Sequence, residues 1–295
     1  MKVLITGGNG QVAFDLRRVC AAAGDDVSSP AHAELDIGVR EEVLQVVGAV
    51  RPDVIFHTAA WTNVDGCELQ PDQAYLVNAI GSRNIAEAAH LVGARVVGLS
   101  TDYVFDGRGS GPNGGGAYNE WDGTGPISHY GRSKLGGEQE LIEILGPEAT
   151  VVRTSWVCGQ HGSNFVKTML RLASDGAAED RSVTVVDDQH GTPTFTADLA
   201  ATLRLLAVHR LPGRFHVSNA GPTTWFEVAR AVFAASGHSP DRVLPVSTAE
   251  LLPLRPAPRP AYSVLDNAAL RAAGLAPLQD WHDPLQQLVA ALRAW

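Results

Sequence analysis

The chain opens with an apolar segment that leads directly into a glycine-rich turn. Residues 3–5 are apolar and predict a buried strand, residues 6–10 read Thr-Gly-Gly-Asn-Gly, and residues 12–22 have the pattern of a helix. Glycines let a backbone approach a pyrophosphate closely, and the N-terminus of the following helix then stabilises the negative charge. Such a turn alone is weak support, but between a strand and a helix it predicts the first unit of a dinucleotide-binding domain.

Short apolar runs and amphipathic segments alternate beyond this unit. The alternation is typical of an α/β fold built on a doubly wound parallel sheet. The predicted elements are strands at residues 54–56, 96–99, 151–152, 183–186 and 215–217, and helices at residues 40–50, 75–92 and 223–235. Four apolar residues of one helix are expected to share a face: Leu76, Ile80, Ile85 and Ala89. The last helix is expected to be capped by Thr223 or Thr224.

Two segments predict irregular structure. Residues 107–125 are rich in glycine, proline and asparagine, and they are expected to form a mobile loop at the mouth of a site. Residues 255–260 contain three prolines and predict a stiff extended connector. A ligand for a proline-binding domain is the alternative, but the stretch is short and internal.

The overall charge narrows the classes of partner. A formal net charge of -9 argues against nucleic acid or an anionic membrane, because both select basic surfaces. Cys20, Cys67 and Cys158 are scattered and odd in number, so they predict neither disulfides nor a metal site and favour a reducing cytoplasm. Residues 1–5 run straight into a predicted core strand, so no signal peptide is expected, and no apolar stretch reaches membrane-spanning length.

A tyrosine and a lysine lie four residues apart, at Tyr130 and Lys134. On a helix these positions share one face, so the ammonium is expected beside the phenol, where it would lower the tyrosine pKa. This spacing also arises by chance on exposed helices. Thr101, however, adds a hydroxyl at the end of the predicted strand at residues 96–99. Together with the glycine-rich turn, these residues resemble the catalytic constellation of the short-chain dehydrogenase/reductases.

Longer strings resemble one subfamily, the dTDP-4-dehydrorhamnose reductases, from residue 1 to about residue 292. The strings are residues 100–107, 130–138, 153–157, 164–169, 188–194 and 259–260. The resemblance implies a Rossmann domain with a smaller α/β substrate-binding lobe. The dinucleotide-binding domain would comprise residues 1–157 and about 194–220. The substrate lobe would comprise residues 158–193 and 221–295.

The resemblance also implies an activity: NAD(P)H-dependent reduction of the C4 ketone of a dTDP-4-keto-6-deoxy-L-hexose, which converts dTDP-4-dehydro-L-rhamnose to dTDP-L-rhamnose. Tyr130 would donate a proton to the C4 oxygen, Lys134 would hold the tyrosine and the nicotinamide ribose, and Thr101 would stabilise the carbonyl. The residues implied to bind the substrate are Asp102, Tyr103, Trp156, Asn164, Gln189 and Arg259. For Arg259 the expected contact is the diphosphate. Trp156 as a core side chain, and Asn164 and Gln189 as loop residues, are the structural alternatives.

The cofactor end has the spacing Gly7-x-x-Gly10-x-x-Ala13, a short variant of the dinucleotide fingerprint. The residues implied to bind the cofactor are Gly7, Gly10, Gln11, Val12, Asp36, Ile37, Ala59, Ala60, Asn78, Tyr130 and Lys134. Asp36 has an alternative role as a cap for the helix at residues 40–50. Residues 27–30 end without an acid and His32 lies where related chains carry an arginine, so NADPH is expected, with NADH possible.

The sequence also bears on metal binding and on alternative functions. No histidine pair has ligand spacing and Asp15 is the one acidic candidate, so no metal is expected. A dehydratase of this fold has Asp-Glu after the threonine, whereas Asp102 is followed by Tyr103. A non-catalytic NADP-binding regulatory subunit is disfavoured because Thr101, Tyr130 and Lys134 are all present. A 4-ketoreductase or dihydrostreptose-type synthase of antibiotic sugar biosynthesis stays open, and so does the choice between monomer and homodimer.

Overall fold

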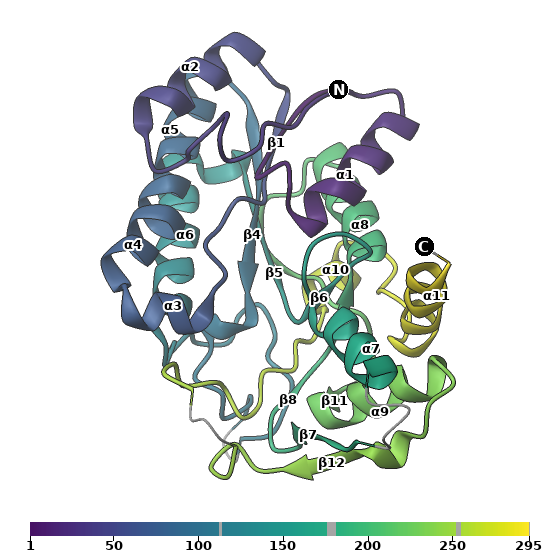
Figure 1. The fold of residues 1–295 in the computed structure, drawn as a ribbon. Helices are drawn as coiled ribbons and strands as arrows, with labels where there is room; N and C mark the ends of the chain where they lie inside the picture. Colours follow the sequence, from purple (N-terminus) through teal and green to yellow (C-terminus); the bar gives the residue numbers. More distant parts are fainter. Residues whose placement is uncertain (112–113, 176–180, 252–254, 295) are drawn as a thin grey trace.

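The structure is a computed structural model that describes residues 1–111, 114–175, 181–251 and 255–294. Its centre is a six-stranded sheet in the order β2-β1-β3-β4-β5-β10 (Figure 1). Every neighbouring pair in this sheet is parallel. The strands are β1 (Lys2–Thr6), β2 (Asp26–Ser28), β3 (Val54–His57), β4 (Arg95–Thr101), β5 (Ala149–Thr154) and β10 (Gly213–His216). The predicted doubly wound parallel sheet is therefore confirmed.

The strand order reverses at β1. The chain passes from β1 to β2 on one side and returns to β3 on the other side, so the connections that leave β1 and β3 run to opposite sides. In open α/β sheets, ligands bind in the crevice at this switch point, outside the carboxyl ends of the strands. The glycine-rich turn follows β1 directly, which places it at the crevice.

Helices cover both faces of the sheet (Figure 1). One face packs α1 (Gln11–Ala22), α8 (Thr196–Val208) and the short α10 (Ala268–Ala272). The other face packs α2 (Arg40–Val50), α5 (Gly81–Val92) and α6 (His129–Leu145). Val3 and Ile5 of β1 point into the first layer and Leu4 into the second, as the alternation of side chains along a strand requires. Burial of both faces explains why the strands have continuous apolar runs.

The helix predicted at residues 75–92 has three parts. It begins as α4 (Pro71–Tyr75), passes through a π-helical turn (Leu76–Ile80) and continues as α5. Ile85 is fully buried, but Leu76 is 42% exposed and Ile80 is 41% exposed. The expectation that all four apolar residues share one face is therefore wrong for Leu76 and Ile80. A π turn holds an extra residue, which rotates the residues before it relative to those after it.

A second group of elements lies beyond the carboxyl edge of the sheet. It packs α7 (Phe165–Asp175), α9 (Trp225–Ala235) and α11 (His282–Arg293) around one apolar cluster. β7 (Val183–Val186) pairs in parallel with β12 (Val243–Val246) at its edge. Short pairs complete it: β6 (Val157–Cys158) with β9 (Thr194–Phe195), and β8 (His190–Gly191) with β11 (Thr223–Thr224). The short α3 (Val64–Leu69) lies between β3 and α4.

The predicted two-lobe division has no direct test and stays a prediction. Leu270 of α10 and Leu278 pack in the cluster of the large sheet although they fall within the segment assigned to the substrate lobe. Thr224, one of the two threonines expected as a cap, accepts a hydrogen bond from the Glu227 amide at 3.3 Å at the start of α9. In the part of the chain that the structure describes, no helix is both long and apolar enough to cross a membrane.

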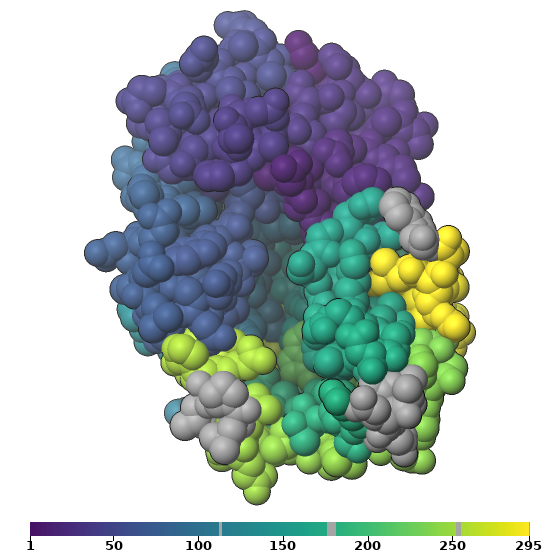
Figure 2. Space-filling model, viewed as in Figure 1, coloured from purple at the N-terminus to yellow at the C-terminus, as the bar shows by residue number. Residues whose placement is uncertain are grey.

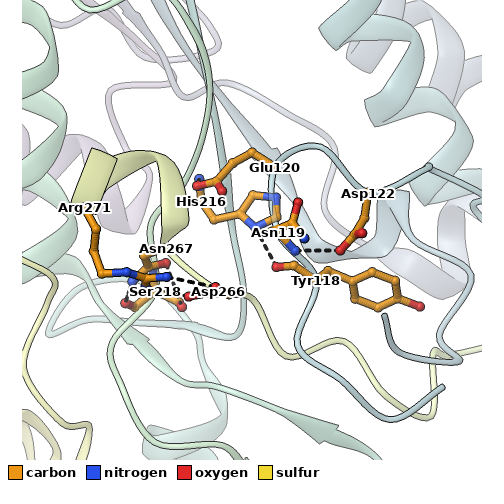
Figure 3. A network of polar contacts seen from close by, with 9 residues as sticks. All are labelled: Tyr118, Asn119, Glu120, Asp122, His216, Ser218, Asp266, Asn267 and Arg271. Atoms are coloured by element: carbon orange, nitrogen blue, oxygen red, sulfur yellow. Dashed lines mark hydrogen bonds and ion pairs between the residues drawn. The ribbon is translucent and has the colours of Figure 1, made fainter. Parts of the chain in front are cut away.

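The segment at residues 107–125 is anchored rather than free. The Tyr118 hydroxyl donates to Asp106 at 2.5 Å, and its ring stacks on Phe105 with centroids 4.1 Å apart. His216 of β10 holds the same segment: its ring nitrogen Nδ1 lies 3.0 Å from the Tyr118 carbonyl, and its amide donates to Glu120 at 2.8 Å (Figure 3). Residues 112–113 lie outside the described residues. Tyr118 and Glu120 are buried, so this part of the segment is packed against the fold, and the expected mobility of the loop stays a prediction.

Candidate active site

Three cavities lie in a row along the carboxyl edge of the sheet. The central cavity has a volume of about 530 Å³ and shares Asn9, Gly10, Thr58 and Ala60 with a cavity of about 440 Å³. On its other side it shares Tyr103 and Trp225 with a cavity of about 620 Å³. Figure 2 shows the surface hollowed between the blue and the teal parts of the chain. None of the described residues of the 107–125 segment lines these cavities, and its expected place at the site mouth stays a prediction.

The predicted catalytic residues line the central cavity together. Ser128 caps α6 by accepting a hydrogen bond from the Gly131 amide at 3.1 Å, which places Tyr130 and Lys134 in the first turns of the helix. Thr101 is the last residue of β4. The Lys134 ammonium donates to the carbonyl oxygen of Leu99 at 2.7 Å. Helix and strand thus bring the phenol, the ammonium and the hydroxyl to one wall.

Burial shifts the pKa values of Lys134 and Tyr130 on this wall. It lowers the pKa of Lys134 to about 8, while the Glu138 carboxylate opposes the shift. The pKa of Tyr130 is raised because the phenol is fully buried, although a hydrogen bond with Thr101 acts in the opposite direction. The expected lowering of the Tyr130 pKa by the ammonium is therefore wrong for this structure. The loss of solvation outweighs the effect of the neighbouring groups.

The Asp102 carboxylate at the central cavity is held by two hydroxyl groups. Thr101 donates to one carboxylate oxygen at 3.0 Å, and Ser263 donates to the other at 2.5 Å. Burial raises the pKa of Asp102 to about 6 although both hydrogen bonds oppose the shift. The adjacent Tyr103 packs edge-on against Tyr130, with ring centroids 5.5 Å apart. Asp102 and Tyr103 both line the central cavity, as predicted.

The glycine-rich turn closely approaches the end of β3. Gly7 has φ of +71°, and a Cβ atom there would lie 2.9 Å from the Cα of Ala59, so only glycine fits without a shift. Gly10 is the N-cap of α1 and offers no side chain to the amides of the first turn. The Gln11 side chain accepts from the Gly159 amide and the Asn164 amide group at 3.1 and 2.8 Å. The turn can therefore receive an anion at the helix N-terminus.

The smallest of the three cavities, of about 440 Å³, brings together the residues predicted to bind the adenine end of the cofactor. Gly7, Asp36, Ile37, Ala59, Ala60 and His32 all line it. The Asp36 carboxylate accepts a hydrogen bond from the Gly38 amide at 2.9 Å, within its own loop. Asn78 is 1% exposed and does not line any of the three cavities. Its amide group bonds the backbone of Trp61 and donates to Ser133 at 3.0 Å, so it joins the loop after β3 to α6.

Trp156 forms an aromatic wall with a residue that sequence reasoning missed. Its indole stacks on Trp225, with centroids 3.8 Å apart and planes inclined by 14°. Phe165 backs Trp225 at 4.5 Å. Trp225 is the first residue of α9, directly after the cap Thr224, so the start of the helix fixes the position of its indole. Nothing local in the sequence indicates that it stacks on Trp156. The wall lies where the central and largest cavities meet.

The remaining predicted substrate residues differ in position. Gln189 and Arg259 line the largest cavity, and the Gln189 side chain donates to Thr248 at 2.9 Å. Asn164 lines none of the three cavities. Its oxygen caps α7 through the Lys167 amide at 3.0 Å and its nitrogen donates to Gln11. Arg259 makes a two-pronged ion pair with Asp65 of α3.

Side chains that could ligate a metal are scattered in the part of the chain that the structure describes. Within the ranges described, no group of three or more ligating side chains is arranged to hold a metal ion. Asp15 accepts a hydrogen bond from Thr196 at 2.5 Å and lies 3.3 Å from Arg18. The expectation that the protein needs no metal stays a prediction.

A parallel sheet with a glycine turn after its first strand, and a tyrosine, a lysine and a threonine on one cavity wall, define a reductase of the short-chain dehydrogenase/reductase type. The profile of the family described as "RmlD substrate binding domain" matches residues 1–294. The chain belongs to this family.

Named relatives cover nearly the whole chain. The dTDP-4-dehydrorhamnose reductase of Streptomyces griseus is 42% identical over 98% of this chain and 93% of its own length. The dTDP-4-keto-6-deoxy-D-glucose reductase of Streptomyces niveus is 39% identical over 99% of this chain and 97% of its own. The crystal structure of dTDP-4-dehydrorhamnose reductase from Bacillus anthracis in complex with NADP superposes with a TM-score of 0.90 at 41% identity, covering 99% and 100% of the two chains.

Proposed function

We propose that this protein is an NADPH-dependent reductase that converts the C4 ketone of dTDP-4-dehydro-L-rhamnose to the alcohol of dTDP-L-rhamnose. The observation that carries the proposal is the meeting of Tyr130, Lys134 and Thr101 in one cavity, which opens on one side to the glycine-rich turn and on the other to the cavity of Arg259. The full-length relatives that act on dTDP-4-keto sugars support the substrate class.

The residues at the switch point fit a dinucleotide. Gly7 approaches Ala59 too closely for any side chain, and the first turn of α1 has no side-chain cap, so backbone amides remain for a pyrophosphate. The cavity of about 440 Å³ beyond the turn is large enough for an adenine group. A reduced nicotinamide dinucleotide held by these residues would supply the hydride for the reduction of C4.

The protein's own residues would then control the charge that develops on the C4 oxygen. Tyr130 holds its proton firmly because burial raises its pKa, and it donates that proton as the carbonyl becomes an alcohol. Lys134, fixed by the Leu99 carbonyl, lines the same cavity, and its positive charge would stabilise the phenolate that results. Thr101 bonds the tyrosine hydroxyl and borders the same cavity, so it aligns the proton donor with the carbonyl.

NADPH is favoured over NADH at the adenine end. β2 ends at Ser28, and residues 29–33 directly after it carry no carboxylate that would repel a 2′-phosphate. His32 lines the adenine cavity, where a cationic or hydrogen-bonding side chain suits a phosphate. The NADP complex of the B. anthracis relative agrees with this preference.

Another 4-keto sugar nucleotide is the second candidate. The S. niveus relative is named for a D-glucose derivative, and its identity to this chain is close to that of the S. griseus relative. The same catalytic wall serves both sugars, since the reaction at C4 is the same. Product stereochemistry is therefore the property that separates them.

The surroundings of the enzyme are also part of the proposal. The three cysteines are unpaired and buried, which fits a reducing cytoplasm. The substrate is a small dTDP-sugar, and no nucleic-acid or membrane partner is proposed. The choice between monomer and homodimer requires a mass measurement in solution.

A direct assay tests the function. The purified chain is mixed with NADPH and dTDP-4-dehydro-L-rhamnose, the loss of reduced nicotinamide is followed, and the product is identified by NMR. Formation of dTDP-L-rhamnose supports the proposal. Turnover that yields only a different hexose supports the second candidate, and no turnover on any dTDP-4-keto sugar contradicts both.

A further inference from the structure

Asp65 organises the arginine-bearing edge of the largest cavity. Its two carboxylate oxygens accept from the two terminal nitrogens of Arg259, at 3.0 Å from Nη1 and 2.9 Å from Nη2. The Ala257 amide donates to the same carboxylate at 3.2 Å, and Arg255 lies 3.6 Å from it. The Arg259 guanidinium holds the pKa of Asp65 below its usual range. One carboxylate of α3 thus fixes a proline-rich segment that is about 190 residues away in sequence.

The hydrogen bonds of Arg259 can be assigned edge by edge. A guanidinium has five N–H groups in one plane, and they form two separate two-pronged donor edges. Asp65 takes the edge between Nη1 and Nη2, and the Ala257 carbonyl takes the other Nη1 hydrogen at 2.8 Å. The Nε hydrogen and the second Nη2 hydrogen remain, and they form the other edge. Neither has a hydrogen-bond partner in the described residues.

This free edge belongs to a residue that lines the cavity of about 620 Å³. The Arg259 side chain is only 14% exposed, so its plane is restrained by the surrounding chain as well as by Asp65. Asp65 itself does not line the cavity. Its charge is offset by two arginines, which leaves the group of Asp65, Arg255 and Arg259 with one net positive charge.

We propose that Asp65 is a positioning residue, which turns the free two-pronged edge of Arg259 toward the diphosphate of a nucleotide sugar. This inference rests on the proposed function, because it assumes a dTDP-linked substrate. Without Asp65, the guanidinium would rotate or use both edges on the protein, and the planar match to phosphate oxygens would be lost. Asp65 acts through Arg259 and does not contact the substrate.

The test compares ligands with and without a diphosphate. In Asp65→Asn, the amide keeps the shape but directs N–H groups at the guanidinium, so only one of the two hydrogen bonds can remain. We expect the Kd for dTDP and the KM for the dTDP sugar to rise about tenfold or more, since the two-pronged contact of Arg259 with the diphosphate is lost. The affinity for thymidine and for NADPH should stay within about twofold of wild type, because neither uses this edge.

A matched control removes a similar ion pair elsewhere. Asp266 and Arg271 form a two-pronged pair at 2.6 and 3.0 Å (Figure 3). Neither residue lines any of the three cavities. Asp266→Asn should leave dTDP binding and KM unchanged. Thermal melting of both variants identifies any general loss of structure.

A second variant makes the test independent of how Asp65→Asn folds. Arg259→Lys replaces the planar guanidinium by a single ammonium that has no two-pronged donor edge, so it should weaken dTDP binding by a factor similar to that of Asp65→Asn. Adding Asp65→Asn to Arg259→Lys should then change the Kd for dTDP by less than about twofold. Equal losses for thymidine and dTDP would overturn the inference, and so would tighter dTDP binding in Asp65→Asn. A wild-type protein that binds neither dTDP nor the nucleotide sugar would overturn the proposed function as well, whereas normal wild-type binding with an unaffected variant overturns this inference alone.

Discussion

Replacing Glu138 by glutamine should destabilise the strand ends that carry the catalytic threonine. The Glu138 side chain is 1% exposed and its partner Arg153 is 2% exposed. The carboxylate accepts from Arg153 at 2.9 and 2.8 Å and from the Ser100 hydroxyl at 2.5 Å. Breaking a buried ion pair costs about 3–5 kcal/mol, because the remaining charge is left uncompensated. We therefore expect Glu138→Gln to lose about 3 kcal/mol of unfolding free energy, since the amide keeps one acceptor.

The assay is denaturant unfolding followed by tryptophan fluorescence. Combining Glu138→Gln with Arg153→Met should recover part of the loss, because the double variant removes both charges of the pair. The exposed pair Arg171–Asp175 supplies the control: Asp175→Asn should cost about 0.5 kcal/mol or less. A loss below about 1 kcal/mol in Glu138→Gln would refute the reasoning, since it would mean that the pair is already compensated by its surroundings.

Three further outcomes follow from the site. Tyr130→Phe should abolish most turnover while the Kd for NADPH stays near that of wild type; near-normal turnover would remove the phenol from the acid role. Since burial lowers the pKa of Lys134 to about 8, its positive charge is present below that pH and lost above it, so kcat/KM should fall as the pH rises through about 8. A flat profile across that range would contradict the assignment. The kcat/KM ratio should favour NADPH over NADH, and His32→Arg should increase the ratio, because a guanidinium pairs with a 2′-phosphate; a strong NADH preference would show that the end of β2 is misassigned.

The sheet and the catalytic wall could be predicted because their signals are local. β1, β3, β4 and β5 each contain a short apolar run, and the glycines of the turn between β1 and α1 indicate the backbone conformation that it needs. The four-residue spacing of Tyr130 and Lys134 determines their relative position once α6 forms. Thr101 follows from the end of β4. In each case a stretch of fewer than about ten residues holds the information, so no long-range contact had to be known.

The errors arise where a local pattern depends on its surroundings. The apolar spacing at Leu76 and Ile80 fits an ordinary helix, but the π turn changes the phase before Ile85. The spacing of Tyr130 and Lys134 implies a lowered tyrosine pKa, yet the direction is set by burial, which depends on the folded environment. Asp65 and Trp225 were missed for a related reason. Their partners Arg259 and Trp156 are distant in sequence, and no residue near either of them indicates the pairing.

Trp156 illustrates how such distant contacts maintain an unfavourable local geometry. Its φ of +47° lies in the left-handed region, which costs a bulky residue about 1–3 kcal/mol. The hydroxyl of the preceding Ser155 donates to the Thr192 carbonyl at 2.6 Å, which fixes the chain on that side. Gly191 makes room for the indole, because a Cβ atom there would lie 2.5 Å from the ring. Stacking on Trp225 then offsets part of the strain. The indole lines the central cavity and also packs against the apolar cluster of α7, α9 and α11, so it joins the two structural settings that the sequence left open. Strain of this kind is typical of functional sites, so it supports the proposal that Trp156 binds the substrate, which stays a prediction.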